Sequence, residues 1–259
     1  MFGEDLKQIA ERRMILMGQT AGAKQETDES LGLPAPAKEV VRGGRRIALT
    51  KDFSGVIRKP DVLAVLAERK TRRNYTEESL SQTELAFLLW AANGQREGTE
   101  AKPRRTVPSG GARYPLELYV IVNRVDGLAK GLYHYLSSTH EIEFVKGLEE
   151  QEKWVTEAVR GKEFVGHAPV FFLWTAVPYR GEWHSGIRAM KPILLDTGHS
   201  AQNLYIACEA IGCGMCPVAS YLQAETDRLL CLHHGSQPSE LDEYVIYGAA
   251  LGKISGQDS

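Results

Sequence analysis

Residues 169–177 read Pro-Val-Phe-Phe-Leu-Trp-Thr-Ala-Val, an apolar run as long as one β-strand. A strand with one face in water alternates apolar and polar side chains, and this run does not alternate. We therefore expect a strand that is covered on both of its faces.

Further strands are predicted on either side of that run, at residues 116–122, 132–135, 141–145, 216–221 and 243–251. Helical patterns occupy residues 61–68, 82–94 and 194–211. The second helix is preceded by a capping box, Ser81-Gln-Thr-Glu84, and a glycine turn ends the third. Strands and helices do not follow a regular βαβ order, so the sequence favours an α+β fold over a doubly wound sheet.

The first 60 residues differ from the rest of the chain. Residues 1–17 have a helical pattern, and residues 18–59 are rich in glycine, proline and charge, apart from a short apolar piece at residues 47–49. We expect residues 1–60 to form a helix and an extended arm, which wraps another surface or stays partly mobile. Residues 61–259 then form the main domain.

Composition limits the function. The chain has 259 residues, a formal net charge of −2 and 43% hydrophobic residues, which are ordinary globular values. A nucleic-acid-binding body would carry a broad basic face, and a membrane helix would need roughly 18 consecutive apolar residues. Residues 1–17 are too charged for a signal peptide. We expect a cytoplasmic protein that binds neither nucleic acid nor a membrane.

One local cluster of charge stands out, the segment Arg69-Lys-Thr-Arg-Arg73. Four cations at the end of a predicted helix repel one another, and a dianionic group such as a phosphate would relieve that repulsion. Arginine forks and the Thr71 hydroxyl would be its donors. The alternative is a solvated surface turn, which is the commoner reading of a cationic run by itself.

Two glycine-rich segments are also candidates for a ligand site. Residues 106–115 read Thr-Val-Pro-Ser-Gly-Gly-Ala-Arg-Tyr-Pro, where bare backbone amides can approach a flat ligand or an anion. Residues 212–220 read Gly-Cys-Gly-Met-Cys-Pro-Val-Ala-Ser, where a proline in a strand leaves neighbouring amides free to face a ligand. Taken singly, an ordinary turn and an ordinary helix-to-strand connection explain them equally well. Neither is a phosphate loop of the Walker type or a dinucleotide fingerprint.

Other chemistries have less support. Cys208, Cys213 and Cys216 have the C-x4-C-x2-C spacing of plant-type iron–sulfur proteins, with Cys231 as a fourth. A helical run contains the first cysteine and a strand follows the third, so we expect neither a cluster nor a redox thiol pair. The sequence contains no G-x-S-x-G motif, so Ser109 is not expected to be a hydrolase nucleophile. The spacing of the histidines does not match that of a metal site.

Together, the three segments have the order and spacing found in the nitroreductase-like FMN flavoproteins, which the chain resembles over residues 63–253. It is most similar to the SagB-type dehydrogenase branch, on the motifs Leu89-Trp-Ala-Ala-Asn-Gly94, Arg105-Thr-Val-Pro-Ser-Gly-Gly-Ala-Arg-Tyr-Pro115, Gly131-Leu-Tyr-His-Tyr135 and Asp196-Thr-Gly-His-Ser-Ala-Gln-Asn-Leu-Tyr205. The resemblance implies a nitroreductase-like fold, with a central, mostly antiparallel sheet flanked by helices, and an intertwined homodimer with two flavins at its interface.

The resemblance also implies roles for individual residues. Residues that would hold the FMN phosphate and ribityl chain are Arg69, Lys70, Thr71, Arg73, Gly252 and Lys253. Residues that would contact the flavin ring are Pro108, Ser109, Gly110, Ala112 and Gln202, the loop coming from the partner subunit, and Pro217, Val218 and Ala219 through backbone amides. Arg72 points elsewhere in the family's pattern and should be dispensable. Arg113, Tyr114 and Tyr179 are candidates for the substrate face.

Two departures from the family's pattern affect the expected reaction. Ala112 stands where many nitroreductases have asparagine, and the Lys-Tyr pair of azoline-forming relatives occurs nowhere in the chain. We expect an oxidoreductase that passes hydride from NAD(P)H through FMN to a small, electron-poor acceptor of the nitro or quinone type, or that oxidises a small substrate. The alternatives are a non-catalytic flavin or small-ligand binder and a redox-thiol or iron–sulfur protein.

Overall fold

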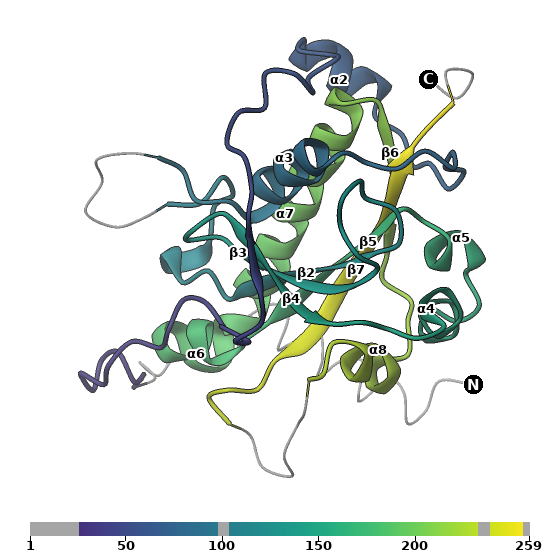
Figure 1. Cartoon of the computed structure of the whole chain (residues 1–259). Coiled ribbons are helices and arrows are strands. Elements are labelled where there is room, and N and C mark those ends of the chain that lie inside the picture. The colour runs from purple at the N-terminus through teal and green to yellow at the C-terminus, as the bar shows by residue number, and fades with distance from the viewer. Residues whose placement is uncertain (1–25, 98–103, 233–238, 256–259) are drawn as a thin grey trace, which may run out of the picture.

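The computed structural model describes residues 26–97, 104–232 and 239–255 (Figure 1). Seven strands form one sheet in the order β1-β4-β3-β2-β5-β7-β6, and every pair of neighbours is antiparallel. The strands are β1 (Arg46–Ala48), β2 (Leu116–Val122), β3 (Gly131–Leu136), β4 (Glu141–Lys146), β5 (Val170–Ala176), β6 (Cys213–Val218) and β7 (Tyr244–Lys253). The expected α+β fold with a mostly antiparallel sheet is confirmed.

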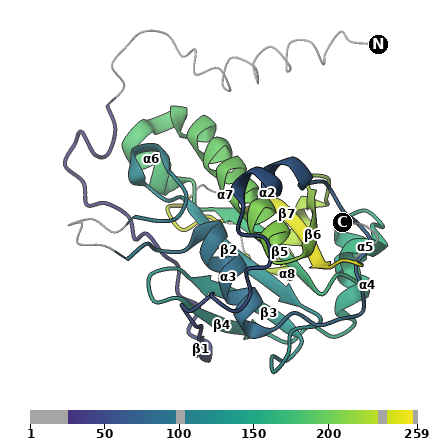
Figure 2. The same cartoon turned by 90° about the horizontal axis from the view of Figure 1, so that it is seen from above.

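Helices lie on both faces of this sheet (Figures 1 and 2). The helices are α2 (Val62–Glu68), α3 (Gln82–Asn93), α4 (Gln151–Ala158), α5 (Glu163–Gly166), α6 (Tyr179–Ser185), α7 (Met190–Ala210) and α8 (Gln223–Leu229), with 3-10 turns η1 (Gly110–Ala112) and η2 (Gly186–Ala189). The long helix α7 and helix α3 pack against each other over one face. Helices α4, α5 and α8 lie over part of the other face.

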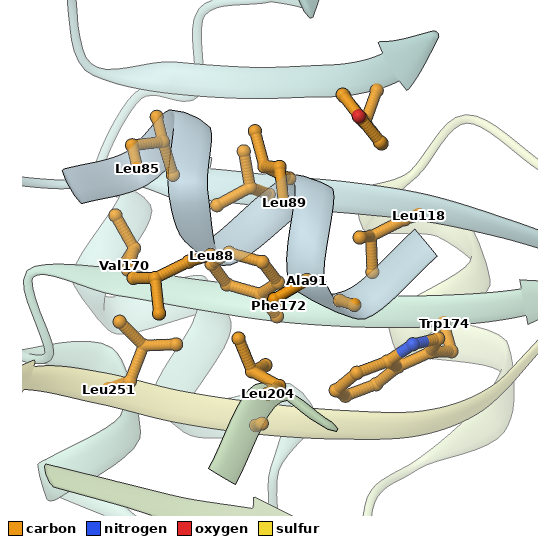
Figure 3. Packing of buried hydrophobic residues seen from close by; sticks show 14 of the residues in the cluster. Leu85, Leu88, Leu89, Ala91, Leu118, Val170, Phe172, Trp174, Leu204 and Leu251 are labelled. Carbon is orange, nitrogen blue, oxygen red and sulfur yellow. The ribbon is translucent and has the colours of Figure 1, made fainter. Parts of the chain in front are cut away.

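Strand β5 lies between β2 and β7, and all seven of its residues are buried. Val170, Phe172 and Trp174 point into the core under α3 and α7, as Figure 3 shows. Phe171 and Leu173 point into the second core on the opposite face. The expectation of a strand covered on both faces is confirmed.

Ser200 of α7 joins three elements in the first core. Its hydroxyl accepts a hydrogen bond from Trp174 Nε1 of β5 at 2.7 Å and donates to the carbonyl of Ala92 in α3. All of these groups are buried, and a buried indole N–H needs such an acceptor. This hydroxyl therefore sets how α3 and α7 sit on the sheet.

The arm crosses the second face of the sheet and is held there by buried carboxylates. Glu117 of β2 accepts a hydrogen bond from the N–H of Val40 at 2.8 Å. Glu143 of β4 accepts from the N–H groups of Arg42 and Gly44, both at 2.8 Å. Backbone amides of the arm thus satisfy carboxylates that the sheet has buried. The arm therefore wraps the chain's own sheet, and its residues 46–48 form β1.

Cations complete this buried network. Arg180 of α6 donates to Glu117 at 2.6 Å, and both side chains are almost fully buried. Burial alone would raise the pKa of Glu117, but Arg180, His134 and Arg105 lower that pKa to about 2. The carboxyl group is therefore charged in the fold and depends on its partners.

Several elements differ from the sequence prediction. The short helices α4, α5, α6 and α8 were not predicted. Helix α7 begins at Met190 instead of residue 194, and strand β6 begins at Cys213 instead of residue 216. The predicted helix at residues 1–17 lies outside the described residues. Among the described residues, no helix combines the length and the apolar character needed to span a membrane.

The Glu117 network gives a pH prediction. A carboxyl group whose pKa is lower in the fold than its ordinary 4.5 stabilises the fold above that value and loses the contribution as the pH falls toward 2. We expect the free energy of unfolding, from urea titrations at several pH values, to fall across that window. Glu117→Gln should flatten the fall, whereas Glu77→Gln, which removes an exposed carboxylate, should not. A wild-type curve with the same slope as Glu117→Gln would contradict the assignment.

Candidate functional site

The cationic segment, residues 69–73, runs from the end of α2 along the outer edge of β6. The N–H of Arg69 closes α2 on the carbonyl of Val65 at 3.1 Å. Thr71 then forms a parallel bridge with Met215, and the N–H of Arg72 donates to the Met215 carbonyl at 3.0 Å. Because β6 is the last strand of the sheet, the segment lies against a strand edge rather than in a free turn.

Side chains of this segment gather around Tyr205 of α7. The Thr71 Oγ1 atom lies 2.7 Å from the Tyr205 hydroxyl, and the Arg69 guanidinium lies 4.9 Å from the centre of the Tyr205 ring. Burial raises the pKa of the Cys216 thiol on β6, and the positive charge of the nearby Arg73 opposes that rise. In the part of the chain that the structure describes, Arg69, Lys70 and Arg73 form no ion pair with a carboxylate. Three cations and a hydroxyl without a protein anion are a fitting donor set for a phosphate monoester.

Arg72 differs from its neighbours because it is buried. It forms an ion pair with Glu209 at 2.7 Å, and only 6% of the arginine side chain and 5% of the glutamate side chain are exposed. The side chain therefore points away from the other cations, as expected. It is not dispensable to the fold, however, because removing it would leave a buried carboxylate short of a partner.

Lys253 and Gly252 lie at the end of β7. The Lys253 Nζ atom is 3.5 Å from a carboxylate oxygen of Glu84 and 3.7 Å from one of Glu78. Gly252 is packed so closely that a Cβ atom would lie 2.6 Å from Pro169. Here the Lys253 ammonium is directed at carboxylates rather than at the Tyr205 group, so its part in holding an anion stays a prediction.

The other candidate residues near the cationic segment lie on β6 and α7. Pro217 and Val218 pair with Ala249 and Gly248 on one side, which leaves their other side on the sheet's outer edge. A proline is tolerated there because an edge strand does not need every ladder hydrogen bond. Ala219 and Gln202 are exposed. Gln202 precedes Tyr205 by three positions on α7 and so shares its face.

The loop at residues 108–115 is anchored at the opposite end of α7. The N–H of Gly110 donates to Asp196 Oδ1 at 3.2 Å, and the N–H of Tyr114 donates to Ser109 Oγ at 2.9 Å. Burial raises the pKa of Asp196, while Ser109 and Gly110 oppose that shift by hydrogen bonding to its carboxylate. The loop is therefore fixed by specific bonds and is not a free turn.

This loop stores backbone strain. Gly111, Ala112 and Tyr114 all have positive φ, of 61°, 52° and 52°. Asparagine tolerates that region better than alanine does, and asparagine is the residue expected from the resemblance at position 112. Ala112 therefore adopts a left-handed conformation that asparagine would tolerate better. Such strain concentrates at functional sites.

A single chain does not bring the two groups together. The loop contacts α7 at Asp196, whereas the cationic segment contacts it at Tyr205. The two positions are nine residues apart in sequence, which is about 13 Å along the helix axis. The loop and the cationic segment are therefore separate groups on the surface of one chain.

The three substrate-face candidates have different surroundings. Arg113 lies with its guanidinium 5.1 Å from the centre of the Trp183 ring and can contact a ligand. Tyr179 donates its hydroxyl to Asp28 of the arm at 2.7 Å. Tyr114 is only 6% exposed and packs beneath the Arg105 guanidinium. Tyr114 therefore supports the loop from inside, and its place on a substrate face stays a prediction.

Sequence reasoning missed the roles of Asp196 and Tyr205, although these residues are the first and last of a motif that it had singled out. Cys208, Cys213 and Cys216 are buried as free thiols. Burial raises the pKa of Cys208 and Cys213, which keeps these thiols protonated and unreactive. Over the described residues there is no group of three or more metal-binding side chains.

Comparison with known proteins agrees with the fold. The Nitroreductase family pattern matches residues 66–252. The chain is 32% identical over 166 residues to MJ1384 of Methanocaldococcus jannaschii, described as a nitroreductase, a match that covers 64% of this chain and 82% of that protein. It is 29% identical over 137 residues to the trifolitoxin-processing protein TfxB of Rhizobium leguminosarum bv. trifolii, covering 50% of this chain but only 36% of that protein.

A solved structure described as a nitroreductase, from Ralstonia eutropha JMP134, has the same fold. It superposes with a TM-score of 0.65 at 23% identity and covers 86% of this chain and 95% of that one. At that identity the likeness shows the fold alone.

Mutations can distinguish the contribution of the buried Arg72–Glu209 ion pair to stability from that of the exposed cations in the same segment. We expect Arg72→Met to lower the free energy of unfolding by about 2–3 kcal/mol, because Glu209 keeps Lys59 but loses its buried partner. Lys70→Met, at an exposed position of the same segment, should change it by less than about 0.5 kcal/mol. Chemical denaturation of both variants measures the difference. Equal effects would show that the buried pair does not stabilise the fold.

Proposed function

The chain belongs to the nitroreductase family, and from that premise we propose that it is an FMN-dependent oxidoreductase. It would pass hydride from NAD(P)H through FMN to a small, electron-poor acceptor of the nitro or quinone type, or oxidise a small substrate. The observation that carries the proposal is the group around Tyr205. There, Arg69 and Thr71 contact Tyr205, and Lys70 and Arg73 belong to the same segment. Within the described residues, no carboxylate neutralises these three cations.

In this proposal the cationic segment holds the phosphate and ribityl chain of FMN. Arg69 is held in place by the Tyr205 ring and Thr71 by its hydroxyl, so two donors are ordered before the cofactor arrives. Gln202 would reach the cofactor from the same face of α7. Gly252 and Lys253 would contribute only if the Lys253 ammonium turned from Glu84 and Glu78 toward the phosphate.

The ring would lie along the outer edge of β6. When bound, FMN supplies hydride transfer at its N5 atom. Backbone groups of Pro217, Val218 and Ala219 lie beyond the paired side of the strand and can face the ring's N5 and O4 edge. An N–H donor there stabilises negative charge that develops on the reduced ring. Pro108, Ser109, Gly110 and Ala112 would cover the ring from a second chain.

We propose a homodimer as well. The loop and the cationic segment contact α7 about 13 Å apart along its axis within one chain, and the family resemblance places the loop of one chain over the flavin of its partner. The exposed side of α7 is also apolar for a surface helix, with Leu194 and Leu195 45% and 53% exposed and Met190 53% exposed. A second copy packed on this side would bury that surface and bring both halves of each site together.

Two narrower assignments are part of the proposal. The match to TfxB, a toxin-processing protein by its name, supports the SagB-type branch, although this chain spans only about a third of that protein. Residues 61–259 would form the flavin-binding unit and residues 1–60 its arm.

A cytoplasmic location stays a prediction. The competing function is a flavin or small-ligand binder without turnover.

Flavin content tests the phosphate assignment. We expect purified protein to be yellow with bound FMN, and Arg69→Ala combined with Arg73→Ala to give folded protein without flavin, because two of the phosphate's cations are lost. Arg45→Ala with Arg46→Ala removes two exposed arginines elsewhere and should keep FMN. Absorbance at the flavin band and circular dichroism measure cofactor and fold together. Full FMN in the Arg69/Arg73 variant would refute the assignment.

Reduction by nicotinamide separates an enzyme from a binder. We expect NADH or NADPH to bleach the flavin absorbance under anaerobic conditions, and a nitro or quinone acceptor to restore it. Stopped-flow absorbance measures both steps. A protein that holds FMN but is inert to both nucleotides would favour the non-catalytic alternative.

A further inference from the structure

His184 of α6 lies against the strained loop. The ideal position of a Cβ atom on Gly111 is 2.8 Å from His184 Cδ2 and 2.9 Å from its Nε2. Only glycine leaves room for the imidazole there, and the φ of 61° at Gly111 also favours glycine. The Nε2 edge of this histidine therefore faces the residues that we have placed beside the flavin ring.

The other ring nitrogen of His184 is bound to the arm. Nδ1 forms a close ion pair and hydrogen bond with the carboxylate of Glu29. A carboxylate at Nδ1 keeps the proton on that nitrogen in the neutral imidazole, which leaves Nε2 as the atom that accepts or donates a proton. Histidine paired in this way with a carboxylate is the arrangement of a general acid–base.

The position of Glu29 is built by several contacts between the arm and α6. The N–H of Glu29 donates to the Trp183 carbonyl at 3.0 Å, and Trp183 Nε1 donates to the Leu33 carbonyl at 3.1 Å. Tyr179 donates to Asp28, the neighbour of Glu29, at 2.7 Å. The carboxylate is therefore delivered to His184 by a docked segment and is not a chance contact of a surface side chain.

A cavity of about 300 Å³ opens beside Glu29. Its walls include Glu29 and Pro36 of the arm, Arg113 of the loop and Trp183 of α6, which is the neighbour of His184 in sequence. The arm thus lines a cavity next to the loop as well as holding Glu29.

We propose that His184 is the proton-transfer residue of the reaction and that Glu29 is its positioning residue. This rests on the proposed function, because the loop must lie against the FMN of a second chain. When bound, FMN would supply hydride to, or take it from, one atom of the substrate's double bond. In reduction, His184 starts protonated on both ring nitrogens and donates the Nε2 proton to the other atom, which leaves the neutral ring with its proton on Nδ1; a proton from solvent then restores Nε2. In oxidation, the neutral ring accepts at Nε2 the proton that leaves the substrate and later releases it to solvent.

Half-reactions of the holoenzyme test the role of His184. We expect His184→Gln to keep its FMN and its rate of anaerobic bleaching by NAD(P)H. Its reoxidation by 4-nitrobenzoate, which takes up protons, should slow about 100-fold. Reoxidation by ferricyanide, which takes only electrons, should not change. Glu29→Gln should slow the 4-nitrobenzoate step about tenfold, because the imidazole is no longer held in one orientation.

A second readout does not depend on turnover. Nitrogen-15 chemical shifts of the His184 ring report which nitrogen carries the proton. We expect the Nδ1–H form in the wild type and a mixture of both forms in Glu29→Gln. An exposed ion pair without a positioning role would leave the wild type mixed as well, and that result would overturn the part assigned to Glu29.

The chain offers a matched control. His167 of the α5 segment pairs through Nδ1 with Glu152 of α4 at 2.8 Å, also at the surface, but α5 and α6 lie at opposite ends of the molecule (Figures 1 and 2). His167→Gln and Glu152→Gln should leave both half-reactions unchanged.

The experiments can refute the proposed function and the proton-transfer role of His184 separately. A wild type that binds no FMN, or is not bleached by NAD(P)H, overturns the proposed function and this inference with it. Normal FMN content and bleaching, with an unchanged 4-nitrobenzoate rate in His184→Gln, overturns the proton-transfer role alone.

Discussion

Burial of three glutamates on one face of the sheet is the constraint on which the rest of this structure depends. Glu117, Glu143 and Glu243 are each at most 5% exposed, and a charged carboxylate is costly to bury unless hydrogen bonds and cations surround it. The sheet does not provide these partners by itself. The arm supplies backbone amides and Arg42, and α6 supplies Arg180. The path of the arm is therefore fixed by the charge that it must cover.

That path reaches the candidate site. Once Arg180 is bound to Glu117, α6 is held at the edge of the strained loop, and the arm continues over α6. The loop rests on one end of α7, and the cationic segment rests on the other. Helix α7 therefore holds these two groups apart on one chain. In the proposed homodimer, a second copy would complete each ligand site after the single chain has folded.

Much of the central fold was predictable because its signals are local. A few neighbouring residues are enough to recognise the apolar run of β5, the capping box of α3 and the glycine turn after α7. Helices α5, α6 and α8 have four to seven residues, which is too short for a clear helical period. In the site, sequence alone could not show that Arg72 is buried among exposed cations. Nor could it show that Glu29 and His184 meet, because 155 positions separate them.

The outer edge of β6 has a consequence for the protein before any cofactor arrives. An edge strand presents unpaired backbone groups to which a strand of another molecule can add, and this is a common start of aggregation. Here Met215 is already bridged by Thr71, Pro217 lacks an N–H to offer, and Arg69, Lys70 and Arg73 crowd the approach with positive charge. The cations that would receive a phosphate therefore also disfavour the addition of a strand from another molecule at this edge.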